Sequence, residues 1–347
     1  MKRKGLQRLA YILAIFALII SLISPAAFAQ ELDVRAKRDL NIEARQAAME
    51  KLVRHQLNVL KTGKVLHESL EDVADQEWVE VIVQLSEDPV ALAKGKKELH
   101  GKVFTAADEK NVEKKVKNQQ VQFERELKAN KILYEKGYTY NKVLNGMVLK
   151  VKGKDLEKLA QINDVVKIDP NDERYVLDVR KNDEFSPMMD RTNDFLNIPE
   201  LWEKGIKGQG VKVAVIDTGI DYEHPELKDV YKGGYNFVEH NPALYKEERA
   251  DDDPYETAPE ERAEGAPEID PNTGRTFHTD HGTHVAGTIA AQGKNAYGIK
   301  GIAPEIELYA YRVLGAYGRG TQDAVIAGIE KAVAEKIIDT YAGETIL

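Results

Sequence analysis

The segment 211–216 constrains the fold most, because it is an almost continuous run of branched and small apolar residues that ends directly in an acid, Asp217. A run without polar alternation is typical of a strand buried on both faces of a parallel sheet. Further patterns alternate along the chain: a helix over 281–291, a second buried strand over 306–314, and a helix over 321–336 with Thr321 as its N-cap. Strands that alternate with helices predict an α/β domain on a parallel sheet, which we place at residues 181–347.

Asp217 falls at the predicted carboxyl end of its strand, the edge of an α/β sheet where ligands and catalytic groups gather. His281 opens the next predicted helix, in the run H-G-T-H-V-A-G. A carboxylate that orients a histidine, and a histidine that accepts a proton, together make an acid and a general base. The plainer alternatives are a strand-end cap for Asp217 and a polar residue at a helix start for His281.

The other histidines near these motifs give weaker indications of function. His281 and His284 lie three residues apart and could bind a metal together, but the sequence has neither an H-E-x-x-H pattern nor a cysteine. We therefore expect His284 to be a hydrogen-bonded residue of the core. His224, in H-P-E-L, is expected to constrain a loop.

A second module precedes this domain, at residues 75–180. Residues 78–85 alternate apolar and polar side chains, as a strand does, whereas residues 109–130 repeat apolar side chains at helical spacing. A hairpin near 142–144, a strand at 146–151, a short helix at 154–161 and a strand at 165–168 follow. The order β-α-β-β-α-β predicts a ferredoxin-like α+β unit.

The N-terminus has the three parts of a secretory signal peptide. A basic head at residues 2–8 is followed by apolar residues at 9–23 and by the small-residue site A-F-A at 27–29. The fifteen apolar residues span only about 22 Å, less than the roughly 30 Å of a bilayer core, although a retained anchor is the alternative. We expect cleavage after residue 29, secretion, and no stable membrane anchor; residues 30–74 are expected to form a charged helical linker.

Charge and composition exclude several classes of function. The formal net charge of −9 argues against nucleic acid as a partner, and the lack of cysteine excludes thiolate chemistry and disulfides. Residues 246–270 form an acidic insertion with eleven acids and three bases. We expect this insertion to be a solvated surface loop, with a loose cation site as the alternative.

Five motifs in order carry a resemblance: D-T-G-I-D at 217–221, H-P-E-L at 224–227, H-G-T-H-V-A-G-T at 281–288, G-I-A-P at 301–304 and Y-R-V-L-G at 311–315. The sequence resembles the subtilases, and especially secreted bacterial members made with an inhibitory propeptide. The resemblance implies a subtilisin-like α/β fold in which Asp217 is the triad acid and His281 the triad base.

The same resemblance implies further roles. Gly318, Arg319 and Gly320 match the edge strand that pairs with the substrate backbone. Glu226 and Asn295 match positions at which some members hold a structural calcium ion; no other cofactor is implied. The ferredoxin-like module would be the propeptide, a chaperone and inhibitor in cis whose extended tail after residue 168 lies in the substrate cleft. Proteins or peptides would be the substrates.

The sequence departs from the family pattern in one respect. A subtilase needs a serine in a G-T-S-x-A context and an oxyanion asparagine downstream, but all serines here precede Asp217, at positions 21, 24, 69, 86 and 186. We therefore expect the precursor of a secreted serine endopeptidase in a form truncated before its serine, and inactive as given. The alternatives are a secreted inhibitor or chaperone of the propeptide type and an inert fragment.

Overall fold

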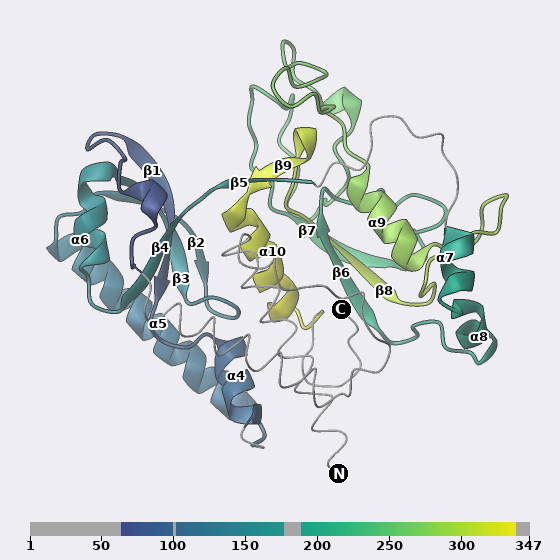
Figure 1. The fold of residues 1–347 in the computed structure, drawn as a ribbon, viewed down its shortest axis with the longest axis horizontal. Coiled ribbons are helices and arrows are strands. Elements are labelled where there is room, and N and C mark those ends of the chain that lie inside the picture. The colour runs from purple at the N-terminus through teal and green to yellow at the C-terminus, as the bar shows by residue number, and fades with distance from the viewer. Residues whose placement is uncertain (1–63, 100–101, 177–188, 338–347) are drawn as a thin grey trace. The chain divides into compact units, whose positions relative to one another are not determined.

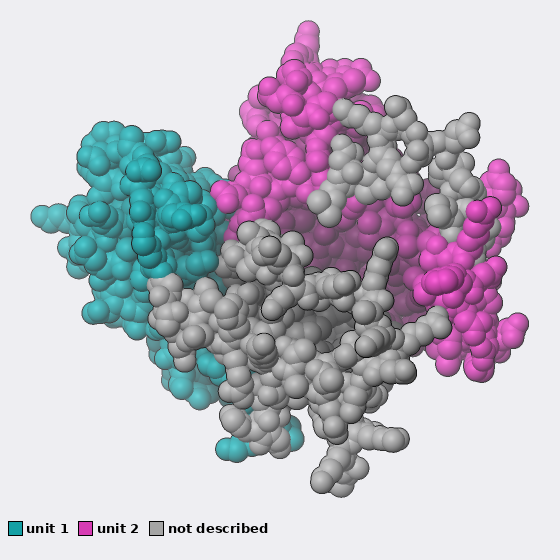
Figure 2. Space-filling view, in the orientation of Figure 1, with its two compact units in different colours: residues 1–171 teal, residues 172–347 magenta. Residues whose placement is uncertain are grey.

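The computed structural model describes residues 64–99, 102–176 and 189–337. The chain divides into two compact units, residues 1–171 and 172–347, which Figure 2 colours separately. The predicted signal peptide and most of the predicted linker lie outside the described residues. Among the helices that are described, none combines the length and the apolar character that crossing a membrane requires.

The first unit is built on a four-stranded antiparallel sheet in the order β2-β3-β1-β4 (Figure 1). Its strands are β1 (Trp78–Leu85), β2 (Tyr134–Tyr140), β3 (Gly146–Lys152) and β4 (Val165–Pro170). Its helices are α4 (Val90–Leu99), α5 (Ala106–Ala129) and α6 (Leu156–Ala160), with 3-10 turns η1 (Glu68–Leu70) and η2 (Gly153–Asp155). The predicted ferredoxin-like order is confirmed, and α4 is an addition that the sequence pattern did not indicate.

Helix α5 supplies much of this core. It begins with a capping box, in which Thr105 and Asp108 each accept the other's backbone N–H. The predicted apolar stripe is buried where it faces the sheet, at Val116, Phe123 and Leu127. Phe123 and Leu127 pack in one cluster with side chains of β1, β3 and α6. One closed hydrophobic core therefore holds the unit together.

Residues 64–74 differ from the expected helical linker. Only η1 is helical there, and Leu70 is buried in the core of the first unit. Leu66 forms a parallel bridge with Ile168, where the amide of His67 donates to the Ile168 carbonyl at 3.0 Å and the Ile168 amide donates to Val65 at 2.7 Å. The apolar side chains of this segment thus belong to the first unit.

The second unit contains a parallel sheet in the order β6-β8-β7, made of β6 (Lys212–Asp217), β7 (Tyr231–Asn236) and β8 (Glu307–Arg312). A separate antiparallel pair joins β5 (Glu173–Tyr175) to β9 (Arg319–Thr321). The helices are α7 (Met189–Phe195), α8 (Ile198–Glu203), α9 (His281–Ala290) and α10 (Gln322–Ala334), with 3-10 turns η3 (Pro259–Glu261) and η4 (Ala316–Gly318). The predicted parallel α/β sheet is confirmed.

Helices α9 and α10 cover opposite faces of this sheet (Figure 1). Ala286 and Ala290 of α9 pack with Val215, whereas Gly328 of α10 lies against Ile216, the next residue of the strand. Successive side chains of a strand point to opposite faces, so the two helices sandwich the sheet.

Two expectations for this unit were wrong in detail. Strand β6 was expected to be buried on both faces, but only Val215 is buried, because β6 lies at an edge of the described sheet. Thr321 holds the N-cap position of α10 but its side chain makes no capping hydrogen bond. Instead the first amide of the helix, that of Gln322, donates to the Asp172 carbonyl at 3.0 Å.

Candidate active site

Asp217 and His281 meet at the carboxyl edge of the parallel sheet. Nδ1 of His281 lies 2.8 Å from Oδ1 and 3.0 Å from Oδ2 of Asp217, although the residues are 64 positions apart. The Thr218 amide donates to Asp217 Oδ1 at 2.7 Å and fixes the carboxylate. A carboxylate only accepts, so the imidazole must donate from Nδ1, which leaves its lone pair on Nε2. The pair can therefore accept a proton at Nε2.

Two glycines allow the strand end and the helix start to approach each other. A Cβ on Gly282 would lie 2.0 Å from the carbonyl oxygen of Gly219 and 3.2 Å from Cβ of Asp217. Gly219 has φ of +110°, and its own Cβ would lie 2.7 Å from the carbonyl oxygens of Pro254 and Tyr255. The D-T-G and H-G-T motifs therefore need glycine because backbone passes on both sides.

Residues 318–320 are paired with a strand, as the resemblance implied for a substrate. Tyr175 is the register partner of Arg319, and Arg174 is the partner of Gly320. The Val176 amide donates to the Gly318 carbonyl at 2.9 Å, and a Cβ on Gly318 would collide with the Val176 side chain. Residues 173–176 are thus extended and paired along residues 318–321, and residue 177 lies outside the described residues.

Arg275 contacts the same tail. Its Nη2 donates to the Val176 carbonyl at 2.8 Å, and its guanidinium lies 5.1 Å from the ring centroid of Tyr175. The tail is therefore held by β9 and also by a cationic side chain that follows the acidic insertion. Sequence reasoning missed this residue, because an isolated arginine in a polar segment carries no local signal.

The acidic insertion 246–270 is not a solvated loop throughout, which corrects the expectation. Glu256 and Thr257 in its middle are only 5% and 1% exposed. The charge of a segment predicts exposure to solvent, but individual polar residues of that segment can be buried if hydrogen-bond donors are available to them. These residues are buried because Arg249 of the insertion, together with an arginine and threonines from other parts of the unit, hydrogen-bonds to them.

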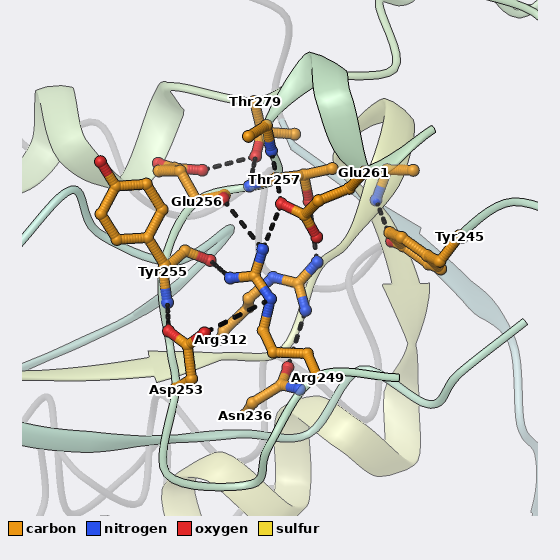
Figure 3. Close-up of polar contacts among 12 residues, drawn as sticks. Asn236, Tyr245, Arg249, Asp253, Tyr255, Glu256, Thr257, Glu261, Thr279 and Arg312 are labelled. Carbon is orange, nitrogen blue, oxygen red and sulfur yellow. Dashed lines mark hydrogen bonds and ion pairs between the residues drawn. The ribbon is translucent and has the colours of Figure 1, made fainter. Parts of the chain in front are cut away.

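Arg249 holds the inner stretch of the insertion by its backbone (Figure 3). Its guanidinium donates to the carbonyl oxygens of Tyr255 and Glu256, and it forms an ion pair with Glu261. Glu261 in turn accepts the Ala258 amide at 2.7 Å. These bonds hold the irregular stretch 255–258 in place.

Arg312 of β8 holds the same stretch from the sheet (Figure 3). It is 2% exposed, donates to Asn236 Oδ1 and to Thr257 Oγ1 at 2.8 Å each, and lies 5.8 Å from the ring centroid of Tyr245. Burial lowers the pKa of this guanidinium. The strand thus presents a cation that reaches across to the insertion.

Glu226 and Asn295, the expected calcium ligands, lie together. Asn295 Nδ2 donates to Glu226 Oε1 at 3.0 Å and to the Ile299 carbonyl at 2.8 Å. Asn295 Oδ1 accepts the amides of Tyr297 and Ile299 at 3.0 and 3.1 Å, so four bonds fix which way the amide points.

This arrangement does not fit a calcium ion, which takes six to eight oxygen ligands. Burial alone would raise the pKa of Glu226, but backbone N–H groups of residues 293–295 and the Asn295 side chain outweigh it and lower the pKa. Although Glu226 Oε2 is buried without a partner, N–H groups surround the carboxylate and would repel a cation. Over the described residues, no group of three or more histidines, cysteines or acids is placed to bind a metal.

The expectations for the other two histidines discussed above, His224 and His284, have different outcomes. His224 accepts the Glu226 amide on its Nδ1 at 3.2 Å, which is the predicted loop constraint. His284 is exposed, not buried. The buried residues of α9 recur at 282, 286 and 290. Position 284 points to the other side of a helix with that buried face, so the core expectation was wrong.

Two families of known proteins match this chain. Residues 208–341 match the model of the Subtilase family, and residues 80–177 match that of Peptidase inhibitor I9. The two matched segments contain, respectively, the Asp217–His281 pair and the ferredoxin-like sheet.

Individual relatives agree with these matches. The chain is 37% identical over 276 residues to the minor extracellular protease Vpr of Bacillus subtilis (strain 168), an alignment that covers 76% of this chain and 29% of Vpr. It is 40% identical over 143 residues to the major intracellular serine protease of the same organism, covering 41% of this chain and 36% of that protein. Subtilisin E, also of that organism, is 37% identical over 142 residues, 41% of this chain and 29% of subtilisin E.

The chain thus spans only 29%, 36% and 29% of the length of these three relatives, respectively. The matched segments nevertheless agree with the fold of each unit and with the order of the motifs. Residues 208–341 therefore belong to the Subtilase family, and they follow a segment at residues 80–177 that belongs to the Peptidase inhibitor I9 family.

Proposed function

We propose that this chain is the precursor of a secreted subtilisin-like serine endopeptidase, which hydrolyses peptide bonds in proteins or peptides. The observation that carries the proposal is the Asp217–His281 pair, joined at 2.8 Å within the segment that belongs to the subtilases. Asp217 holds the imidazole in the Nδ1–H tautomer and stabilises the imidazolium. Nε2 of His281 accepts the proton of a serine nucleophile and returns it to the leaving amine.

The segment that matches the I9 family is proposed to inhibit in cis. The antiparallel pairing of β5 with β9 supports this role, because a substrate strand would use the same backbone groups of residues 318–320. A tail held on that edge competes with substrate. The same unit, with its closed core, is proposed to act as a chaperone for the peptidase segment.

The serine is proposed to come from outside the 347 residues, since none of the five serines follows Asp217. We expect these residues alone to give no turnover of casein or a chromogenic peptide. In subtilisin, loss of the catalytic serine costs about 10⁶ in kcat, and here no oxyanion asparagine of the family pattern is present to keep the remainder. Turnover that persists through repurification and disappears in His281→Ala would refute this expectation.

A DNA reading tests the precursor proposal directly. All frames downstream of codon 347 are read for a G-T-S-x-A segment and an upstream asparagine. Their presence supports a serine endopeptidase, and appending that segment should restore turnover that depends on His281. Their absence favours the second candidate.

The second candidate is a secreted inhibitor that acts on other subtilases. It is favoured by the separate hydrophobic core of the first unit, which includes Leu66 and Leu70. The full chain and residues 64–177 should be titrated against active subtilisin E. No inhibition by either up to about 100 μM, far weaker than specific pairing, removes this candidate.

Secretion is proposed from the signal-peptide pattern of residues 1–29, and Vpr, which is extracellular by name, is a relative. N-terminal sequencing of the protein recovered from a Bacillus culture medium should begin at Gln30. Recovery only with the membrane fraction, with an intact N-terminus, would instead indicate the retained anchor.

A further inference from the structure

Glu256 is the only buried acid of the insertion 246–270, all of which the structure describes. Its carboxylate accepts four hydrogen bonds. These come from Thr218 Oγ1 at 3.0 Å, Thr279 Oγ1 at 2.5 Å, the Thr283 amide at 2.9 Å and Thr283 Oγ1 at 3.3 Å. The insertion thus sends one carboxylate into a pocket of threonines, and Figure 3 shows it reaching Thr279.

The direction of each threonine hydroxyl is fixed by a second bond. Each hydroxyl oxygen already accepts a backbone N–H: Gly282 to Thr218 at 2.9 Å, Thr257 to Thr279 at 3.1 Å and Asp221 to Thr283 at 2.8 Å. A hydroxyl has one hydrogen, so all three hydrogens are directed at Glu256. Four donors then surround a side chain that must only accept, which an ionised carboxylate does and an amide does not.

The donors lie close in sequence to both members of the Asp217–His281 pair. Thr218 directly follows Asp217 at the end of β6, and Thr283 lies two residues after His281 in the first turn of α9. Asp280, at the N-cap position of α9, makes no side-chain capping bond. Glu256 therefore provides the anionic cap that this helix start lacks locally, where a negative charge is favourable.

The backbone that carries Glu256 is itself fixed. Arg249 holds its carbonyl, and Arg312 holds the side chain of the following residue, Thr257. Burial raises the pKa of Glu256, an effect that the threonine donors oppose and the Asp217 charge reinforces. The carboxylate is thus placed from its own loop as well as from its donors.

We propose that Glu256 is a positioning residue for the catalytic pair: it ties the end of β6 to the start of α9 and so sets the Asp217–His281 hydrogen bond. The inference rests on the proposed function, because it assigns Glu256 a role in that same site. It also assigns a role to the acidic insertion, which places one carboxylate against the residues next to Asp217 and His281.

The test follows the His281 ring by NMR in the full chain labelled with 15N-histidine. In the wild type, the Nδ1–H proton held by Asp217 should resonate downfield of the backbone amides, and the signal should vanish in His281→Ala. Glu256→Gln places an amide N–H against hydroxyls that already donate, so the downfield signal should be lost or broadened by exchange with water. Glu247→Gln is the matched control, since Glu247 is exposed in the same insertion and should leave the signal unchanged.

The outcomes separate cleanly. A Glu256→Gln protein that melts at a lower temperature but keeps the wild-type signal would show that Glu256 only stabilises, and would overturn the inference alone. A wild type without the downfield signal would overturn the pair geometry and with it the proposed function. If Glu256→Gln does not fold, Thr218→Val removes one link of the same network while keeping the carboxylate, and the same loss of signal is expected; an unchanged signal overturns the inference.

Discussion

Helix α9 contains two glycines for which the same substitution should have opposite effects. A Cβ on Gly282 would lie 2.0 Å from the Gly219 carbonyl oxygen, whereas a Cβ on Gly287 would meet no atom within 4 Å. In Gly282→Ala the helix start must move by more than about 1 Å to reach an ordinary contact, and overpacking of this kind costs about 1–3 kcal/mol. In Gly287→Ala the loss of backbone freedom in the unfolded chain should stabilise by about 0.5–1 kcal/mol.

For a unit of this size these free energies correspond to a Tm about 2–12 °C lower for Gly282→Ala and about 1–4 °C higher for Gly287→Ala. The two tryptophans make the assay specific, because Trp78 lies in β1 and Trp202 in α8. Thermal unfolding followed by fluorescence in a Trp78→Phe background reports the second unit alone. Trp78 is 42% exposed, so its replacement should be tolerated.

Gly282→Ala should also displace His281 from Asp217, because their 2.8 Å contact depends on the same close approach. A displacement near 1 Å is large for catalytic geometry. The downfield Nδ1–H signal should therefore weaken in Gly282→Ala and persist in Gly287→Ala. Equal Tm values for the two variants would refute the steric explanation of the H-G-T motif.

Three further results are expected. Leu127→Ala, at a fully buried position of α5, should lower the free energy of unfolding of the first unit by about 2–5 kcal/mol. Val121→Ala, at a 43% exposed position of the same helix, should change it by no more than about 0.5 kcal/mol. Unfolding of both variants is followed by Trp78 fluorescence in a Trp202→Phe background. Hydrogen bonds from Lys97 and Thr105 lower the pKa of Asp108, so its contribution to stability is present above the ordinary carboxyl pKa and is lost as pH falls through the lowered value. The Tm difference between wild type and Asp108→Asn should accordingly shrink on acidification from pH 7, and a constant difference would exclude this linkage. We also propose that the hydrogen bond from the Asn295 amide to Glu226 takes the place of a bound ion. Neither EDTA nor millimolar calcium should then shift the Tm of the second unit, and a rise in Tm with calcium would contradict this proposal.

The sequence was sufficient where the signal is local. Alternation predicted β1, helical spacing predicted α5, and the acid at a strand end together with the histidine at a helix start predicted the pair that lies at 2.8 Å. In these segments, the spacing of apolar residues within the segment predicts both the type of secondary structure and the face that is buried.

The rest depends on contacts between distant segments. Glu256 is buried because its side-chain donors come from positions 218, 279 and 283, all of them outside the insertion. Arg249 lies within the insertion, but its bond to the Glu256 carbonyl cannot be read from a charge pattern. His284 is exposed because the buried face of α9 runs through other positions. A pattern read along one segment cannot weigh such partners.

The bridge between Leu66 and Ile168 has a consequence for how the first unit behaves in solution. β4 is an edge strand, and an edge offers unpaired backbone groups to any other chain with a free strand. Val65 and His67 occupy both outward-facing groups of Ile168, at 2.7 and 3.0 Å. A polypeptide that begins at residue 75 would leave this edge open and would expose apolar side chains of the core cluster to which Leu70 belongs, so it should self-associate. One that begins at residue 64 keeps both contacts and should not self-associate through this edge.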